Sequence, residues 1–165
     1  ANAYLIGECG SGRAILFDTG AGIEALEATW PKAIRELAAV FLTHVDGEHA
    51  GGLCDVVARF GAPEAFIPVG ATAACGRPLG EGGVRRYGAL EVSAYTTPGH
   101  AAQHNCYLVH QSGDAAGPAV LMSGDLVFAG SVGGRISRTN SFRRTCAACS
   151  GCWPPGRLLL RDTAH

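Results

Sequence analysis

The sequence predicts an α/β fold in which two β-sheets are covered by helices. Short runs of β-branched and aromatic residues are interspersed with two stretches whose apolar residues recur at helical spacing. The first two strands form a pair joined by a glycine-rich turn. Three apolar strands end directly in loops that carry His or Asp, which is where an α/β protein places its site. Strands in pairs followed by helices favour two sheets over one parallel sheet.

The composition narrows the class of protein. A chain of 165 residues suits one domain with a real core. Apolar residues make up 47% and charged residues 16%, and the net charge is −1, which argues against disorder and against a basic nucleic-acid-binding face. No apolar run reaches the roughly 18 residues that a membrane span requires. The expected partner is therefore a small-molecule substrate, with no nucleic acid and no membrane, and the oligomeric state stays open.

The N-terminal half is predicted to begin with a hairpin and to continue through two helices. Residues 3–7 and 13–17 are the paired strands around the turn Gly10-Ser11-Gly12. Residues 23–37 have helical spacing, and Pro31 is expected to divide that helix. The apolar run 40–42 reads as a buried strand, and a second helix is expected over 49–60.

The C-terminal half is predicted to be mainly strands. The stretch 70–89 is rich in glycine and is expected to be irregular. Further strands are expected over the following ranges: 65–69, 90–97, 106–109, 119–122 and 158–160.

Candidate metal ligands gather at the ends of three strands. The loop after 40–42 carries four of them within six residues, and one more follows each of the strands 90–97 and 119–122. Divalent metals require ligands of these types converging from separate elements. A single histidine is more often a core or surface residue, but the joint placement favours a site. The candidates are His44, Asp46, Glu48, His49, His100, Asp125 and the terminal His165.

Cysteine usage bears on the compartment. The seven cysteines are an odd number, and no stretch has the charged and apolar regions of a signal peptide. The sequence therefore predicts reduced thiols and a cytoplasmic protein; because the chain begins at Ala1, an organelle stays open if an N-terminal segment is missing. Cys146, Cys149 and Cys152 form two C-x-x-C steps without a fourth ligand nearby, so we interpret them as reduced cysteines of the tail and not as a zinc or cluster site.

The residues 43–52, Thr-His-Val-Asp-Gly-Glu-His-Ala-Gly-Gly, resemble the T-H-x-H-x-D-H-x-G-G motif of the metallo-β-lactamase-fold superfamily. Other segments follow in the family's order: Asp18-Thr19-Gly20 looks like its D-T-G, residues 97–100 look like its T-P-G-H, and Ser123-Gly124-Asp125 looks like its T-G-D. Residues 130–135 are similar to the G-G-x-G-R stretch of the glyoxalase II and persulfide dioxygenase branches, with one extra residue.

The resemblance implies an αβ/βα sandwich of two mixed sheets flanked by helices, with a metal site at the sheet edges. It implies a core domain over 1–135, completed or capped by a short tail over 136–165. By position, His44 and His100 belong to a first metal site and His49 to a second, with Asp125 bridging the two and His165 as the late ligand. The implied ions are zinc, one or two per chain, with iron as an alternative.

This chain departs from the family pattern at two ligand positions. Asp46 stands where the family has His, which makes the first site richer in oxygen and favours iron or manganese relative to zinc. Glu48 stands where the family has Asp, so its reach differs by roughly one bond length, although it could still ligate or act as a base. Residues 136–157 also replace what is a longer helical stretch in the family.

The leading functional prediction is a metal-dependent hydrolase. A bound metal ion lowers the pKa of water from 15.7 to about 7, so that hydroxide is present at neutral pH. The hydroxide would attack a polarised carbonyl, with Asp125 bridging or orienting and Glu48 as a general base if it is not a ligand. The glyoxalase II resemblance points to a thioester or ester such as an acylglutathione.

Two alternatives stay open. His44, His100 and Asp125 form a two-histidine, one-carboxylate set that suits a mononuclear iron enzyme similar to persulfide dioxygenases. The altered motif and short tail also fit a degenerate family member without catalytic activity.

Overall fold

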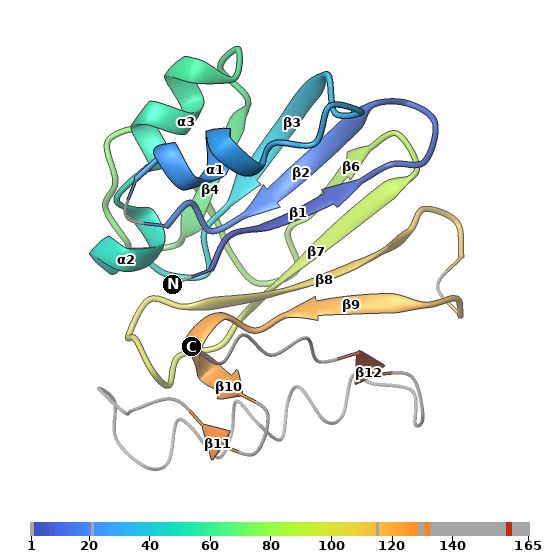
Figure 1. Ribbon diagram of the computed structural model, residues 1–165. Coiled ribbons are helices and arrows are strands. Elements are labelled where there is room, and N and C mark those ends of the chain that lie inside the picture. Colours follow the sequence, from blue (N-terminus) through green and yellow to red (C-terminus); the bar gives the residue numbers. More distant parts are fainter. Residues whose placement is uncertain (1, 21, 115, 129–130, 133–157, 160–165) are drawn as a thin grey trace.

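The computed structural model of the protein describes residues 2–20, 22–114, 116–128, 131–132 and 158–159. Two five-stranded sheets pack face to face, and the three α-helices of the described residues lie over the first sheet (Figure 1). Both sheets contain parallel and antiparallel pairs, so the prediction of two mixed sheets is confirmed. A second helical layer over the other sheet is not among the described residues.

The first sheet begins with the predicted hairpin. Strands β1 (Tyr4–Gly7) and β2 (Arg13–Phe17) pair antiparallel across a turn in which Gly10 and Gly12 have positive φ angles. The remaining three strands are all parallel to their neighbours, in the order of the sequence. They are β3 (Glu36–Phe41), β4 (Glu64–Pro68) and β5 (Arg77–Leu79).

The second sheet is an antiparallel meander with one parallel edge strand. Its meander consists of β6 (Val84–Tyr87), β7 (Leu90–Thr96), β8 (Asn105–Gln111) and β9 (Ala119–Met122). The edge strand β12 (Leu158–Leu159) lies parallel to β9, as expected of a last short strand over 158–160. A short 3₁₀ turn, Gly124–Leu126, follows β9 and leads to the small hairpin β10 (Val127–Phe128) and β11 (Ser131–Val132).

Alternation along the strands divides the core into two layers. On β2, the side chains of Ile15 and Phe17 face the second sheet, whereas Leu16 faces the helices, as the period of two in a strand requires. Phe17, Phe41 and Tyr107 contact one another between the sheets, with ring centroids 5.3 to 5.7 Å apart. The central strands are thus apolar on both faces, which explains why they appear in the sequence as continuous apolar runs.

The helix predicted over 23–37 is wrong beyond its first half. Helix α1 covers only Glu24–Thr29, and Trp30 then adopts an extended conformation with ψ of 123°. The ring of Pro31 disfavours helical geometry at the residue before it, so the helix ends there. Leu37, assigned to the apolar face of that helix, lies on β3 instead and is buried beneath the helices.

Two further predictions of secondary structure need correction. The helix expected over 49–60 is divided into α2 (Gly47–Ala50) and α3 (Leu53–Arg59). At the break, a Cβ on Gly52 would lie 3.3 Å from the carbonyl oxygen of Thr19, so glycine lets the two backbones approach without displacing either. The stretch 70–89 is not irregular, since it contains β5 and β6.

Two hydrogen bonds join the sheets at the end where β3 finishes. The hydroxyl of Tyr107 donates to the carbonyl oxygen of Leu42 at 2.8 Å, and the backbone N–H of Asn105 donates to the carbonyl oxygen of Thr43 at 2.8 Å. The polar groups of these residues are buried, so the bonds satisfy atoms that water does not reach. They hold the loop after β3 against the first residues of β8.

A disulfide overturns part of the prediction that the thiols are reduced. Cys54, at the start of α3, is bonded to Cys75 in the segment before β5. Of the other described cysteines, Cys9 is a free thiol and exposed, whereas Cys106 is buried and accepts a hydrogen bond from the hydroxyl of Thr97. The disulfide attaches α3 to the chain that follows β4.

Several predictions fall outside the described residues. The C-x-x-C cysteines of the tail and His165 belong to this group, as does most of the segment 136–165. The division into 1–135 and 136–165 stays a prediction. Among the helices of the described residues, none has the length and apolar character needed to cross a membrane.

The disulfide yields the first testable prediction. Replacing both Cys54 and Cys75 by serine should lower the free energy of unfolding by about 3 kcal/mol, because the bond closes a loop across a sequence separation of 21 residues. Urea denaturation with and without a reductant measures this difference. Cys9→Ser is the matched control and should leave stability within about 0.5 kcal/mol of the parent. An equal midpoint for the double variant and the parent would contradict the prediction.

Candidate metal centre

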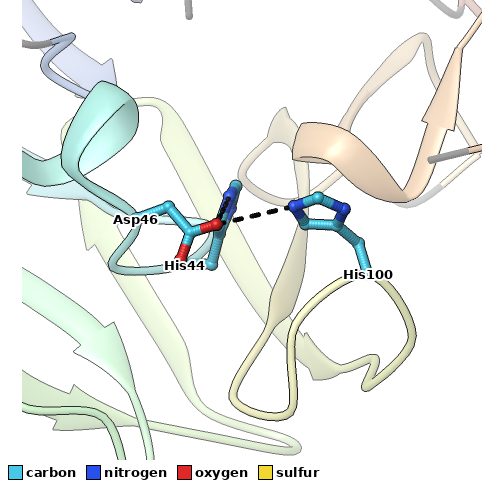
Figure 2. Close-up of side chains that lie close together, drawn as sticks. All are labelled: His44, Asp46 and His100. Carbon is cyan, nitrogen blue, oxygen red and sulfur yellow. Dashed lines mark ion pairs between the residues drawn. The ribbon is translucent and has the colours of Figure 1, made fainter. Parts of the chain in front are cut away.

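The loop after β3 and the loop after β7 bring three side chains together. The carboxylate of Asp46 lies between two imidazoles, with its Oδ2 atom 3.7 Å from Nε2 of His44 and 3.7 Å from Nε2 of His100 (Figure 2). The potential ligand atoms of these three residues all lie within 4.8 Å of one another. His44 is buried, whereas 48% of the Asp46 side chain is exposed, so the group is open to solvent on the Asp46 side.

A second group of three shares His44 with the first. It adds His49 from α2 and Asp125 from the 3₁₀ turn after β9. The Asp125 carboxylate reaches both groups, since its Oδ1 atom is 3.3 Å from Nε2 of His49 and its Oδ2 atom is 3.9 Å from Nε2 of His100. The ends of β3, β7 and β9 therefore meet at one edge of the sandwich.

Beneath the two groups lies the buried carboxylate of Asp18, at the end of β2. It accepts the backbone N–H of Thr43 at 2.8 Å and the Thr43 hydroxyl at 2.9 Å. Its Oδ2 atom is also 3.0 Å from Nδ1 of His49. Asp18 has a φ angle of 54°, in the left-handed region that aspartate tolerates better than most residues. Asp18 of the D-T-G segment thus holds Thr43 and His49 in place from the buried side of the site.

These hydrogen bonds fix which nitrogen of each imidazole carries the proton. A carboxylate only accepts, so His49 donates from Nδ1 to Asp18, and in the neutral form of this imidazole Nε2 carries no proton. The Thr43 hydroxyl has one hydrogen, which goes to Asp18; it therefore accepts from Nδ1 of His44, which lies 3.0 Å away.

This tautomer is the form in which a histidine binds a metal through Nε2. The Nε2 atoms of His44 and His49 are both buried and make no well-aligned hydrogen bond, although the Asp125 carboxylate lies 3.3 Å from Nε2 of His49. Buried polar atoms are normally paired, so two bare nitrogens that face two carboxylates fit a cation between them. The donor set of imidazole and carboxylate suits zinc, iron or manganese.

The pKa shifts follow the same arrangement. Burial lowers the pKa of His44, and the neighbouring His49 imidazole adds to that effect. Burial also acts to lower the pKa of His49, but the hydrogen bond and charge of Asp18, together with Asp125, outweigh it and raise that pKa. At neutral pH, His44 is therefore held as the neutral imidazole that a metal requires.

A fourth imidazole at the site was missed by sequence reasoning. The His104 side chain is fully buried, and its ring stacks on that of His44 with centroids 5.3 Å apart. Burial, with the neighbouring imidazoles of His44, His100 and His49, lowers the pKa of His104 to about 3. His104 follows His100 by four residues in an Ala- and Gln-containing loop, and that spacing was the only signal available in the sequence.

The remaining predicted ligands are placed differently. Glu48 lies on α2 and is exposed. It belongs to neither of the two three-residue groups of potential ligands among the described residues. His165 lies outside the described residues. The structure thus brings together His44, Asp46, His49, His100 and Asp125, and their roles as ligands stay predictions.

A comparison with protein families matches residues 1–158 to the metallo-β-lactamase superfamily. Among curated proteins, the chain is 35% identical over 115 residues to the lactamase-like protein aptB of Emericella nidulans. It is 31% identical over 114 residues to an atrochrysone carboxyl ACP thioesterase from the same organism. Each match covers 67% of this chain but only 36% of the relative, so this chain spans about a third of their length.

Solved structures confirm the fold. A metallo-β-lactamase from Staphylococcus aureus superposes with a TM-score of 0.72, covering 90% of this chain and 48% of that protein, at 18% sequence identity. The two-sheet architecture is therefore the metallo-β-lactamase-like fold that the sequence motifs predicted.

Gly124 provides a test of how tightly the site is packed. It has a φ angle of 49°, and a Cβ there would lie 2.5 Å from Oγ1 of Thr43. Gly124→Ala should therefore displace Thr43 from Asp18 and lower the free energy of unfolding by about 1–3 kcal/mol beyond the backbone cost. Gly113→Ala is the control, because Gly113 has a φ angle of 83° and nothing within 4 Å of the added Cβ. Equal losses in urea denaturation would show that the contact with Thr43 is unimportant.

Asp18 provides a test that depends on pH. In metal-free protein, Asp18→Asn should lower the free energy of unfolding by about 2–3 kcal/mol, because it weakens buried hydrogen bonds to a charged group. The folded-state pKa of His49 is raised, so protonation of His49 stabilises the fold below its unfolded pKa and this contribution is lost as the pH rises through the folded value.

The difference in unfolding free energy between parent and Asp18→Asn should consequently be larger at about pH 5.5 than at about pH 8.5. Asp55→Asn, which changes an exposed carboxylate on α3, should shift stability by less than about 0.5 kcal/mol at either pH. A difference in unfolding free energy between parent and Asp18→Asn that grows with rising pH would contradict the assigned role of Asp18.

Proposed function

The chain belongs to the metallo-β-lactamase superfamily, and from that membership we propose that it is a metal-dependent hydrolase that cleaves a thioester. The observation that carries this proposal is the convergence of three histidines and two aspartates from three chain segments at one sheet edge. Three of these five residues come from the loop and short helix after β3, and the others follow β7 and β9.

The shared histidine limits how the ions are held. Nδ1 of His44 is engaged by Thr43, so only Nε2 is available, and one nitrogen serves one ion. An ion held by His44, Asp46 and His100 would leave His49 and Asp125 as the described ligands of a second ion. We therefore expect one ion bound more tightly than the other.

The residues around the ions supply the remaining functions. A bound divalent ion would lower the pKa of water and polarise the substrate carbonyl. Asp125 lies within 4 Å of both His49 and His100, where its carboxylate can orient the attacking water and accept a proton. The exposed side of Asp46 leaves a path for substrate, while Asp18 and Thr43 keep the buried imidazoles in place.

The choice of a thioester rests on the relatives. The acyl carrier protein thioesterase that matches at 31% identity acts, by its name, on a thioester. An acylglutathione, which the glyoxalase II resemblance suggests, belongs to the same class of substrate. Glu48 is not favoured as the general base, because it is exposed and outside both groups of converging ligands.

A second candidate is favoured by one specific observation. His44, Asp46 and His100 form a two-histidine, one-carboxylate group, which is the ligand type of mononuclear iron oxygenases. The set predicted from the sequence has Asp125 in place of Asp46, and Oδ2 of Asp125 lies 3.9 Å from Nε2 of His100. An iron enzyme of the persulfide dioxygenase kind would hold one ion on His44 and His100 with one of these two carboxylates, and would need no second ion.

The test combines metal analysis with a thiol-release assay. Purified protein loaded with zinc, manganese or, without oxygen, ferrous iron is supplied with an acyl thioester, and the released thiol is measured. We expect His100→Ala to lower kcat/KM by at least about a hundredfold, because it removes a ligand contributed by a separate loop. The same protein is tested for oxygen consumption with a glutathione persulfide.

His110→Ala is the matched control for this assay. Its side chain is 13% exposed, close to the 17% of His100, but it pairs with Glu91 on the second sheet and lies in neither metal group. Thiol release that depends on His100 and not on His110 supports the hydrolase. Oxygen consumption with one bound iron and no thiol release would favour the dioxygenase, and absence of bound metal would reject both enzymes.

A further inference from the structure

We propose that His104 is a positioning residue, which holds the metal ligands His44 and His100 in their relative places. This inference rests on the proposed function, because it requires that these histidines bind a metal ion. His104 itself belongs to neither group of converging ligand atoms among the described residues, so it is not assigned as a ligand.

The first observation is the contact between the two buried rings. The imidazoles of His104 and His44 stack with an angle of 28° between their planes and centroids 5.3 Å apart, and both side chains are fully buried. The edge of the His44 ring that carries Nδ1 is held by the Thr43 hydroxyl. The hydroxyl fixes the direction of the His44 nitrogens, and the flat ring of His104 limits rotation of the ring plane.

The second observation is that His104 closes the loop that carries His100. The backbone N–H of Thr97 donates to the carbonyl oxygen of His104 at 2.9 Å, and Oγ1 of Thr97 lies 3.0 Å from Nδ1 of His104. The two ends of the segment 97–104 are therefore joined twice, once through the backbone and once through side chains. His100 lies in the middle of that closed segment.

The third observation connects this loop to the first ligand. The residue after His104 is Asn105, whose N–H donates to the carbonyl oxygen of Thr43, the neighbour of His44, at 2.8 Å. The ring contact and this backbone bond together attach the loop of His100 to the loop of His44. The two loops follow strands of different sheets. His104 therefore lies where the alignment of the sheets determines the spacing of the ligands.

A histidine meets both requirements at this position. An aromatic residue without nitrogen would preserve the stacking but lose the bond to Thr97, and a small amide would preserve that bond but lose the stacking. The cost of a histidine is visible at its other nitrogen, since Nε2 is buried and has no hydrogen-bond partner. The imidazole is therefore retained for its shape together with its Nδ1 atom.

The test compares His104→Phe, which keeps a ring, with His104→Asn, which keeps a polar group near the Nδ1 position. Zinc affinity is measured by competition with a chromophoric chelator, and the visible spectrum of the cobalt-substituted protein reports the ligand geometry. We expect each variant to bind the tighter zinc ion about 10- to 100-fold more weakly, the loss typical of residues that orient ligands, and to alter the cobalt spectrum.

Thr97→Val removes the hydroxyl partner without touching the ring and should give part of the same loss. Combined with His104→Phe it should add little, because both changes remove one interaction. Val109→Ala, a core change on β8 away from the site, controls for lost stability and should leave the cobalt spectrum unchanged.

If the parent binds zinc and all His104 variants retain its affinity and cobalt spectrum, the positioning role is rejected and the proposed function stands. If Val109→Ala reproduces the effect of His104→Phe, a general loss of stability explains it and the proposal is also rejected. A parent that binds no zinc would overturn the proposed function along with this inference.

Discussion

The arrangement of the site depends on one buried carboxylate, that of Asp18. It receives hydrogen bonds from the backbone and hydroxyl of Thr43 and from Nδ1 of His49. Because a carboxylate only accepts, these bonds place a proton on Nδ1 of both His44 and His49, so that Nε2 is the nitrogen left for a metal ion when each imidazole is neutral. The buried Nε2 atom of each histidine faces a carboxylate at this edge, an arrangement that a bound cation would stabilise, and Asp18 holds both imidazoles in it.

The two-sheet architecture explains why residues far apart in the sequence can share this site. The loops after β3, β7 and β9 all leave the sandwich at the same edge, and hydrogen bonds from Asn105 and Tyr107 align the two sheets there. A shift of one sheet relative to the other would separate His44 from His100. The packed aromatic rings of Phe17, Phe41 and Tyr107 between the sheets resist such a shift.

Motifs and apolar runs predicted the sheets and the converging residues, because strand ends and metal ligands leave short, local patterns. Packing between side chains at the site leaves no such local pattern. The role of His104 becomes visible only in the fold, where its ring stacks on that of His44. The helix predicted to reach Leu37 failed because a strand and a helix can present the same apolar residues, and only Pro31 marked the change. Likewise, the bond between Cys54 and Cys75 depends on where α3 packs, which spacing alone does not reveal.

Asp18 and Thr43 keep both buried histidines in the tautomer whose Nε2 is available to a metal ion. Long-range ¹H–¹⁵N correlation spectra of the zinc-loaded protein, with ¹⁵N-labelled histidine, measure this directly. We expect a protonated Nδ1 and a metal-bound Nε2 for both His44 and His49. A protonated Nε2 on either residue would contradict it.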